Sequence, residues 1–148
     1  MDLSWLKWPI IVLVVALFFW LLSSAGVNYM FNKFTSGTPG VDAAVDARNE
    51  AGLTHLGNYL MKTLRYAKAE EVIQRAVDDY PNGANIYMNM YRLARLAEKR
   101  EDYKRSAEIL QYLIDEDAPS KNKHLVSVEI LQARLEKLIA VHELDKKK

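Results

Sequence analysis

The fold is decided by residues 53–81, which read LTHLGNYLMKTLRYAKAEEVIQRAVDDYP. Apolar residues recur here every three or four positions, first at Leu53, Leu56, Leu60 and Leu64, then at Val72, Ile73, Ala76 and Val77. This spacing predicts two amphipathic helices, each with one apolar face. Pro81-Asn82-Gly83 ends the second helix, because proline and glycine are the poorest helix formers. The segment therefore predicts a helical hairpin.

The same periodicity continues on both sides of this hairpin. It predicts five helices, over residues 42–63, 66–80, 84–99, 102–116 and 120–143. Asp102 is expected to cap the fourth helix and Ser120 the fifth. No stretch sustains the two-residue alternation that is typical of a strand. The predicted fold class is therefore all-α, an α-solenoid of helical hairpins that follows an N-terminal helix.

The spacing of the hairpin also repeats along the chain. The first copy carries its signature at Leu53, Leu56, Gly57, Leu60, Ala69, Ile73, Ala76 and Pro81. A second copy, offset by 37 residues at most positions, carries Met90, Leu93, Ala94, Ala97, Ser106, Leu110 and Leu113. A third, incomplete copy begins at Val128, Leu131 and Leu135. These copies resemble the tetratricopeptide repeat (TPR), whose period is about 34 residues.

The resemblance implies a stack of hairpins whose first helices line a concave groove that binds peptides or partner helices. By the register of the repeat, this face carries Thr54, Asn58, Met61, Met88, Tyr91 and Arg95. Asn58 matches an asparagine with which some members bind a C-terminal carboxylate, but Thr54 stands where those members have a lysine. We therefore expect these six residues to bind a protein partner without that specificity. The last helix is expected to cap the stack.

An uncharged stretch of 25 residues, from Trp8 to Asn32, precedes the hairpins. As a helix it measures roughly 37 Å, which exceeds the ~30 Å hydrocarbon core of a bilayer. Aromatic residues flank it at both ends, as is typical of membrane interfaces. We therefore predict one membrane-spanning helix over residues 8–27, within a transmembrane anchor of residues 1–31.

Two further features concern the fate of this anchor and its connection to the hairpins. Ser23-Ser24-Ala25 before Gly26 has the small residues of a signal-peptide cleavage site, so a cleaved leader is the alternative to a retained anchor. Residues 32–41 are rich in Gly, Pro, Ser and Thr and are predicted to form a linker. The helical domain is then predicted to occupy residues 42–148.

The composition leaves little material for catalysis. The chain of 148 residues has 20 Lys and Arg against 19 Asp and Glu, which argues against a dedicated nucleic-acid surface. It has no cysteine, and its histidines at positions 55, 124 and 142 form no metal-ligand spacing. Phosphate-loop and nucleophile-elbow motifs are absent. We expect no enzymatic activity, cofactor, metal, nucleic acid or small-molecule substrate.

Basic residues cluster between Arg92 and Arg105, where acidic residues interleave with them. This cluster is interpreted either as a solvated, salt-bridged face or as a docking site for an anionic partner.

The sequence thus predicts a membrane-anchored TPR interaction module that acts as a scaffold, assembly factor or accessory subunit of a membrane protein complex. Its expected partners are proteins in or near the membrane, and the lipid bilayer through the N-terminal helix. The alternative is a targeting or translocation receptor for signal peptides or protein tails. Lys7 abuts the apolar stretch, whereas no basic residue lies between Lys33 and Arg48. We therefore place the protein in a bacterial inner membrane, with its C-terminal domain outside the cytoplasm.

Overall fold

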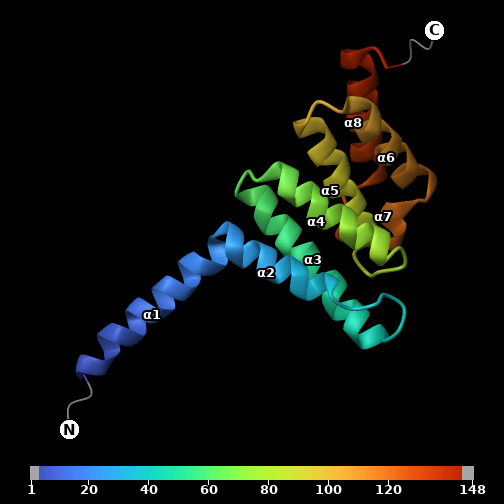
Figure 1. Ribbon diagram of the computed structural model, residues 1–148. Helices are drawn as coiled ribbons and strands as arrows, with labels where there is room; N and C mark the ends of the chain where they lie inside the picture. The colour runs from blue at the N-terminus through green and yellow to red at the C-terminus, as the bar shows by residue number, and fades with distance from the viewer. Residues whose placement is uncertain (1–3, 145–148) are drawn as a thin grey trace.

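The computed structural model describes residues 4–144 and contains helices but no strand in that range (Figure 1). The first three residues of the predicted anchor and the last four of the predicted domain lie outside it. The helices are α1 (Ser4–Leu22), α2 (Ser24–Thr35), α3 (Ala43–Lys62), α4 (Tyr66–Asp79), α5 (Ile86–Lys99), α6 (Tyr103–Asp115), α7 (Ala118–Lys121) and α8 (Val128–His142). The prediction of an all-α fold is confirmed.

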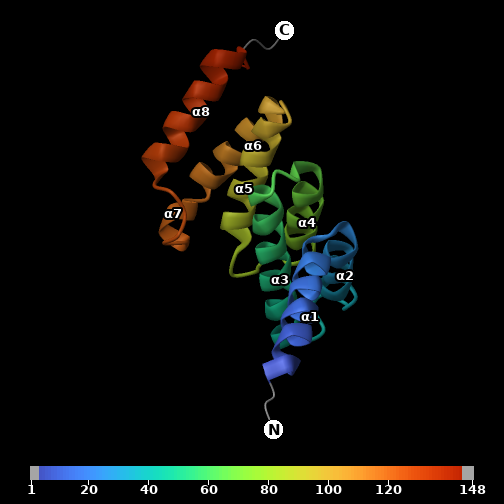
Figure 2. The same cartoon turned by 90° about the vertical axis from the view of Figure 1, so that its left-hand side faces the viewer.

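The helices α3 to α8 form a stack in chain order. α3 packs on α4 and α5 on α6, so each pair is a hairpin; α4 contacts α5, and α6 contacts α8 (Figure 2). One apolar core lies within the first hairpin and reaches α2 and α5, and a second joins α5, α6, α7 and α8. The α-helical hairpins predicted over residues 42–116 are therefore present.

The spaces that the repeat pattern predicts between paired helices are filled tightly. A Cβ atom built on Gly57 would lie 2.2 Å from Cγ1 of Ile73 on the facing helix. Ala69 and Ala76 on the same face of α4 are buried. In the second hairpin the equivalent positions Ala94 and Ser106 are also buried. The chain thus keeps small residues where two helix backbones approach closely.

The turns of the two hairpins have the same backbone conformation. Leu64 has φ of 60° and Glu101, its equivalent in the second copy, has φ of 63°. A left-handed conformation at a non-glycine residue costs about 1–2 kcal/mol, so the packing of the two helices must hold each turn. The recurrence of this turn supports the internal repeat independently of the side-chain pattern.

The last predicted helix, over residues 120–143, is wrong in its first part. The chain instead forms the single turn α7, leaves it at Asn122 in an extended conformation and re-enters a helix at Val128. The Asn122 side chain accepts a hydrogen bond from the backbone N–H of His124 (3.0 Å), which favours a loop. Leu125 belongs to the apolar period from which this helix was predicted. It lies in the loop, and its side chain is buried in the second core. Ser120 lies inside α7 and does not cap a helix, whereas Asp102 caps α6 as predicted, accepting from Arg105 N–H.

The predicted single helix over residues 8–27 is also wrong, because the chain bends at Ser23. Ser23 has an extended backbone, and its hydroxyl donates to the Trp20 carbonyl (2.6 Å) and accepts from Gly26 N–H (3.3 Å). It therefore ends one helix and caps the next. Within residues 4–144 no single helix combines the length and hydropathy of a membrane span. The pair 7–20 and 24–35, bent by 71°, does so only when its two parts are taken together.

The helix that follows the bend, α2, packs on the hairpins. Val27 is fully buried against the first hairpin, and the Phe34 ring lies so close to Gly52 that a Cβ there would come within 2.4 Å of it. Arg65 donates to the Ser24 hydroxyl (3.2 Å) across the start of α4. The first residues of the predicted linker are therefore helical, and only residues 36–42 separate α2 from α3. α1 is joined to the hairpins by a packed helix and a short loop.

Candidate functional site

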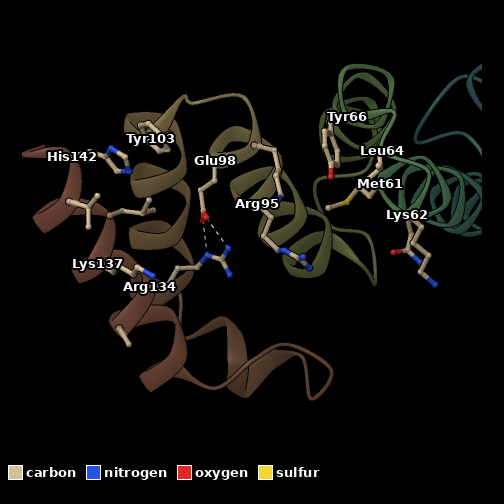
Figure 3. Close-up of a pocket in the computed structure, with 15 residues that line it drawn as sticks. Met61, Lys62, Leu64, Tyr66, Arg95, Glu98, Tyr103, Arg134, Lys137 and His142 are labelled. Atoms are coloured by element: carbon tan, nitrogen blue, oxygen red, sulfur yellow. Dashed lines mark hydrogen bonds and ion pairs between the residues drawn. The ribbon is translucent and has the colours of Figure 1, made fainter.

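A groove of about 1060 Å³ lies between the first helices of the repeats and the terminal helix α8. Its walls come from the C-terminal half of α3, the C-terminal half of α5 and the last three turns of α8, with Tyr66 and Tyr103 at the starts of the second helices (Figure 3). First helices line a concave face in a stack of hairpins, because the second helices cover the outer side. The groove is thus a product of the repeat and of its terminal helix.

Three of the six predicted groove residues line this hollow: Asn58, Met61 and Arg95. The other three, Thr54, Met88 and Tyr91, do not. The side chains of Glu50 and Thr54 on α3 hydrogen-bond Asn85 and Asn89 at the start of α5, so this part of the two helices is closed to the groove.

Each of the three residues outside the groove has a structural contact instead. Thr54 is only 5% exposed, and its hydroxyl accepts a hydrogen bond from Asn89 Nδ2 (2.8 Å). Met88 is half-buried against the second core. Tyr91 is buried, and its hydroxyl accepts a hydrogen bond from Arg134 (3.3 Å), whose guanidinium also lies 5.9 Å from the ring centroid. Tyr91 therefore lies outside the groove and helps to hold Arg134, which lines it.

The predicted set omits the whole contribution of α8. This helix was interpreted as a cap, yet Arg134, Lys137, Leu138 and Val141 line the groove. They recur every three or four residues, so the helical period already places them on one face. A terminal helix that buries one stripe against α6 presents its neighbouring stripe to the concave side. The recurrence of Arg134, Lys137, Leu138 and Val141 was therefore the sequence signal from which the contribution of α8 to the groove could have been predicted.

The centre of the groove holds an ion pair between α5 and α8. Glu98 accepts two hydrogen bonds from Arg134, at Nε (2.7 Å) and Nη2 (2.8 Å), and one from the Ser106 hydroxyl (3.2 Å). Burial raises the pKa of Glu98, but the hydrogen bonds and charge of Arg134 outweigh it and hold the pKa below its usual value of 4.5. The same bonds raise the pKa of Arg134. Two parallel bonds of this kind fix orientation as well as distance.

The remaining charges of the groove are positive. Lys62, Arg95, Lys99 and Lys137 line it and form no salt bridge within residues 4–144. Glu98 is the only carboxylate in the lining, and Arg134 neutralises it. Burial lowers the pKa of the neighbouring Arg92, and the positive charge of Arg95 lowers it further. The groove therefore carries a local excess of positive charge in a chain whose net charge is +1.

Comparison of the chain with family models, with curated proteins and with solved structures found no match. The described residues contain no group of three or more His, Asp or Glu side chains that could hold a metal ion. Fold and site together define an all-α protein of stacked helical hairpins with a basic, partly apolar groove. Such a groove can bind a segment of another molecule through charge and apolar contact.

The ion pair at the centre of the groove leads to a stability prediction. Replacing Glu98 with glutamine leaves Arg134 partly buried among other cations, so we expect the free energy of unfolding at pH 7 to fall by about 1–3 kcal/mol. Urea denaturation in mild detergent measures this loss. Glu108→Gln is the matched control, because Glu108 pairs with Lys104 at 3.9 Å on an exposed surface and should contribute almost nothing.

The comparison of wild type with Glu98→Gln also predicts how the free energy of unfolding depends on pH. The pKa of Glu98 is lower in the folded than in the unfolded protein, so its stabilisation is complete above the unfolded pKa and is lost as pH falls through the folded one. The difference between wild type and Glu98→Gln should therefore begin to shrink near the unfolded pKa of about 4.3 and close at lower pH, where the folded carboxylate is protonated. A difference that persisted in acid would show that the ionised carboxylate is not its source.

Proposed function

We propose that this protein is a membrane-anchored interaction module, and that it acts as a scaffold, assembly factor or accessory subunit of a membrane protein complex. In this proposal α1 enters the bilayer, α2 connects it to the hairpins, and the groove between α3, α5 and α8 holds a segment of a partner protein. The observation that carries the proposal is the groove itself, because its lining includes exposed apolar and unpaired charged side chains together.

The membrane part of the proposal is supported by the surface of α1. Every described side chain from Lys7 to Trp20 is exposed, and all but Lys7 are apolar. A helix that is apolar on all sides and has no protein around it is expected to be covered by lipid. α1 has 19 residues and therefore measures about 28 Å, close to the ~30 Å core of a bilayer.

The position of the module relative to the bilayer follows from α2. Its polar face, with Asn28, Asn32 and Lys33, is exposed, and its apolar face packs on the first hairpin. α2 is therefore suited to the aqueous side of the interface, with the bend at Ser23 close to the membrane surface. A partner that reaches the groove should be anchored in the same membrane or lie at its surface.

The charge of the groove favours this function over a receptor for signal peptides. A signal peptide begins with a positively charged segment, and four unpaired cations in the groove would repel it. A partner segment with acidic residues has the complementary charge. We also propose a location in a bacterial inner membrane; the orientation, with the hairpins outside the cytoplasm, follows from the charges that flank the apolar stretch.

Site-specific photo-crosslinking in native membranes tests the proposed function. A photoreactive amino acid at Asn58 or at Met61 should crosslink the same partner protein. The matched controls are Ala67 and Tyr112, which are exposed on the second helices α4 and α6, and should not. The proposal is overturned if the partner crosslinks from the control positions or from α1 alone, because the interaction would then lie outside the groove.

A further inference from the structure

We infer that the groove is built for an acidic, amphipathic peptide segment, one that presents carboxylates together with large apolar side chains. This inference rests on the proposed function and specifies the chemistry of its partner. It is carried by the charges of the groove, by their contrast with the paired cations of α4 and α6, and by two exposed apolar side chains in the lining.

The first argument is the placement of the unpaired cations. Lys62 comes from α3, Arg95 and Lys99 from α5, and Lys137 from α8, so the positive charges stand on all three walls of the groove (Figure 3). A ligand with a single carboxylate can contact one of these walls. A chain with several carboxylates along its length can contact all three, which favours a peptide over a small anion.

The second argument is that the groove contrasts with the second helices α4 and α6, on which every basic residue forms a salt bridge. Glu70 on α4 pairs with both Arg100 and Arg105, and Arg75 pairs with Asp79 at 2.7 Å. The basic cluster between Arg92 and Arg105 is thus divided by the fold. Arg100, Lys104 and Arg105 form salt bridges, and Arg92 donates to the side chain of Asn89. Arg95 and Lys99 line the groove and form no salt bridge within residues 4–144. The anionic-partner interpretation of this cluster therefore applies to its groove-facing members.

The third argument is the apolar part of the lining. Leu64 is 70% exposed and Val141 is 62% exposed, and these two residues lie on opposite walls of the groove. Met61, Tyr66 and Leu138 also line the groove. Apolar side chains grouped with unpaired cations in a hollow mark a binding surface. The volume of about 1060 Å³ lies just above the ~300–1,000 Å³ range of small-molecule sites, which again favours a peptide segment.

Selection from a library of short random peptides tests the inference. The full-length protein is held in nanodiscs of a zwitterionic lipid, and peptides are enriched for binding to wild type and depleted on Arg95→Glu/Lys137→Glu. We expect the enriched sequences to contain Asp or Glu together with Leu, Ile or Phe. Enrichment of neutral or basic sequences would overturn the inference but leave the proposed function standing. Failure to enrich any groove-dependent peptide would count against both.

Fluorescence anisotropy of one enriched peptide then measures the effect of charge. Arg95→Glu/Lys137→Glu should weaken its binding by about 10- to 100-fold. The matched control is Arg48→Glu/Lys123→Glu, which changes the net charge equally at exposed cations outside the groove, and should change binding by less than about 2-fold, as rim charges do. If both variants lose the same amount of peptide affinity, the loss comes from the change in net charge and not from the groove, and the inference is overturned. Thermal melts confirm that both variants are folded.

Anionic lipid and nucleic acid are the competing occupants, and each gives a distinct result. Replacing part of the zwitterionic lipid by phosphatidylglycerol should leave peptide binding within about 2-fold of its value, since surface charge is screened within a Debye length of roughly 8 Å. If the anionic bilayer displaces the peptide from wild type, the groove is a lipid-headgroup site and the inference fails. It also fails if a random single-stranded oligonucleotide competes with the peptide more strongly than a polyglutamate of equal charge.

Discussion

Replacing Gly57 with leucine is expected to lower the free energy of unfolding by about 1–3 kcal/mol or more, the cost of overpacking a filled core. The Cβ atom alone would lie 2.2 Å from Cγ1 and 2.9 Å from Cδ1 of Ile73, and both residues are buried. α3 and α4 would have to separate along the first hairpin, which holds α2 on one side and α5 on the other. Chemical denaturation in mild detergent measures the loss.

A double-mutant cycle separates this clash from other effects of losing a glycine. Ile73→Ala alone should cost about 2–5 kcal/mol, because it empties a buried site. In the Gly57→Ala background the same change also removes the clash, so its cost should fall by about 0.5–3 kcal/mol, the range of coupling between residues in contact. Simple additivity of the two substitutions would contradict the close approach of α3 and α4. Gly37→Ala is the control, because its Cβ would meet only ends of side chains, Asn49 Nδ2 at 3.3 Å and Val45 Cγ1 at 3.9 Å.

The hairpins could be predicted from the sequence because their signals are local. The apolar period of α4 and the cap at Asp102 each depend on residues within one or two turns. The break at Ser23 could not be predicted in this way. No charged residue lies between Trp8 and Val27, but Ser23 and Ser24 end the strictly apolar stretch, and the chain bends there as Val27 and Phe34 pack on a hairpin that lies later in the sequence. A tertiary contact overrides the apolar run.

The groove could be predicted in part for the same reason. Register along α3 places Thr54 and Asn58 on one face, which is correct for the helix taken alone. It does not say where α5 crosses that face, and Asn89 covers Thr54 but not Asn58. The role of Arg134 also depends on a partner 36 residues away, Glu98, that no local pattern identifies. The sequence therefore predicts which residues share a helix face, whereas the burial of each residue depends on where the neighbouring helix packs.

Placing two arginines in the middle of α1, at Val14 and Leu17, is expected to release the protein from the membrane. Each arginine at the centre of a spanning helix costs about 2.5–3.5 kcal/mol, so the pair should shift the partition by more than roughly 10³-fold. The measurement is the fraction of protein that stays in the pellet after a carbonate wash. Both side chains are exposed, so the substitutions remove no contact from the hairpins.

The matched control places the same two charges on α8, at Gln132 and Ala140, which are exposed. This variant should stay in the pellet, and the thermal unfolding of the hairpins should be the same in both variants. If the α1 variant also stays in the pellet, the anchor lies elsewhere, and the proposed membrane insertion of α1 is wrong.

A cleaved leader is the remaining alternative, and the bend at Ser23 argues against it. Ser23 caps α2 through Gly26 N–H, and Ser24 accepts from Arg65. Cleavage before Gly26 would remove both residues, leaving the first turn of α2 without its cap and Arg65 without this partner. Such a loss of a cap costs about 0.5–2 kcal/mol, and Val27, fully buried, would then be the second residue of the chain. We therefore expect N-terminal sequencing of the membrane-bound protein to begin before Ser23; a start at Gly26 would replace the anchor by a secreted hairpin domain.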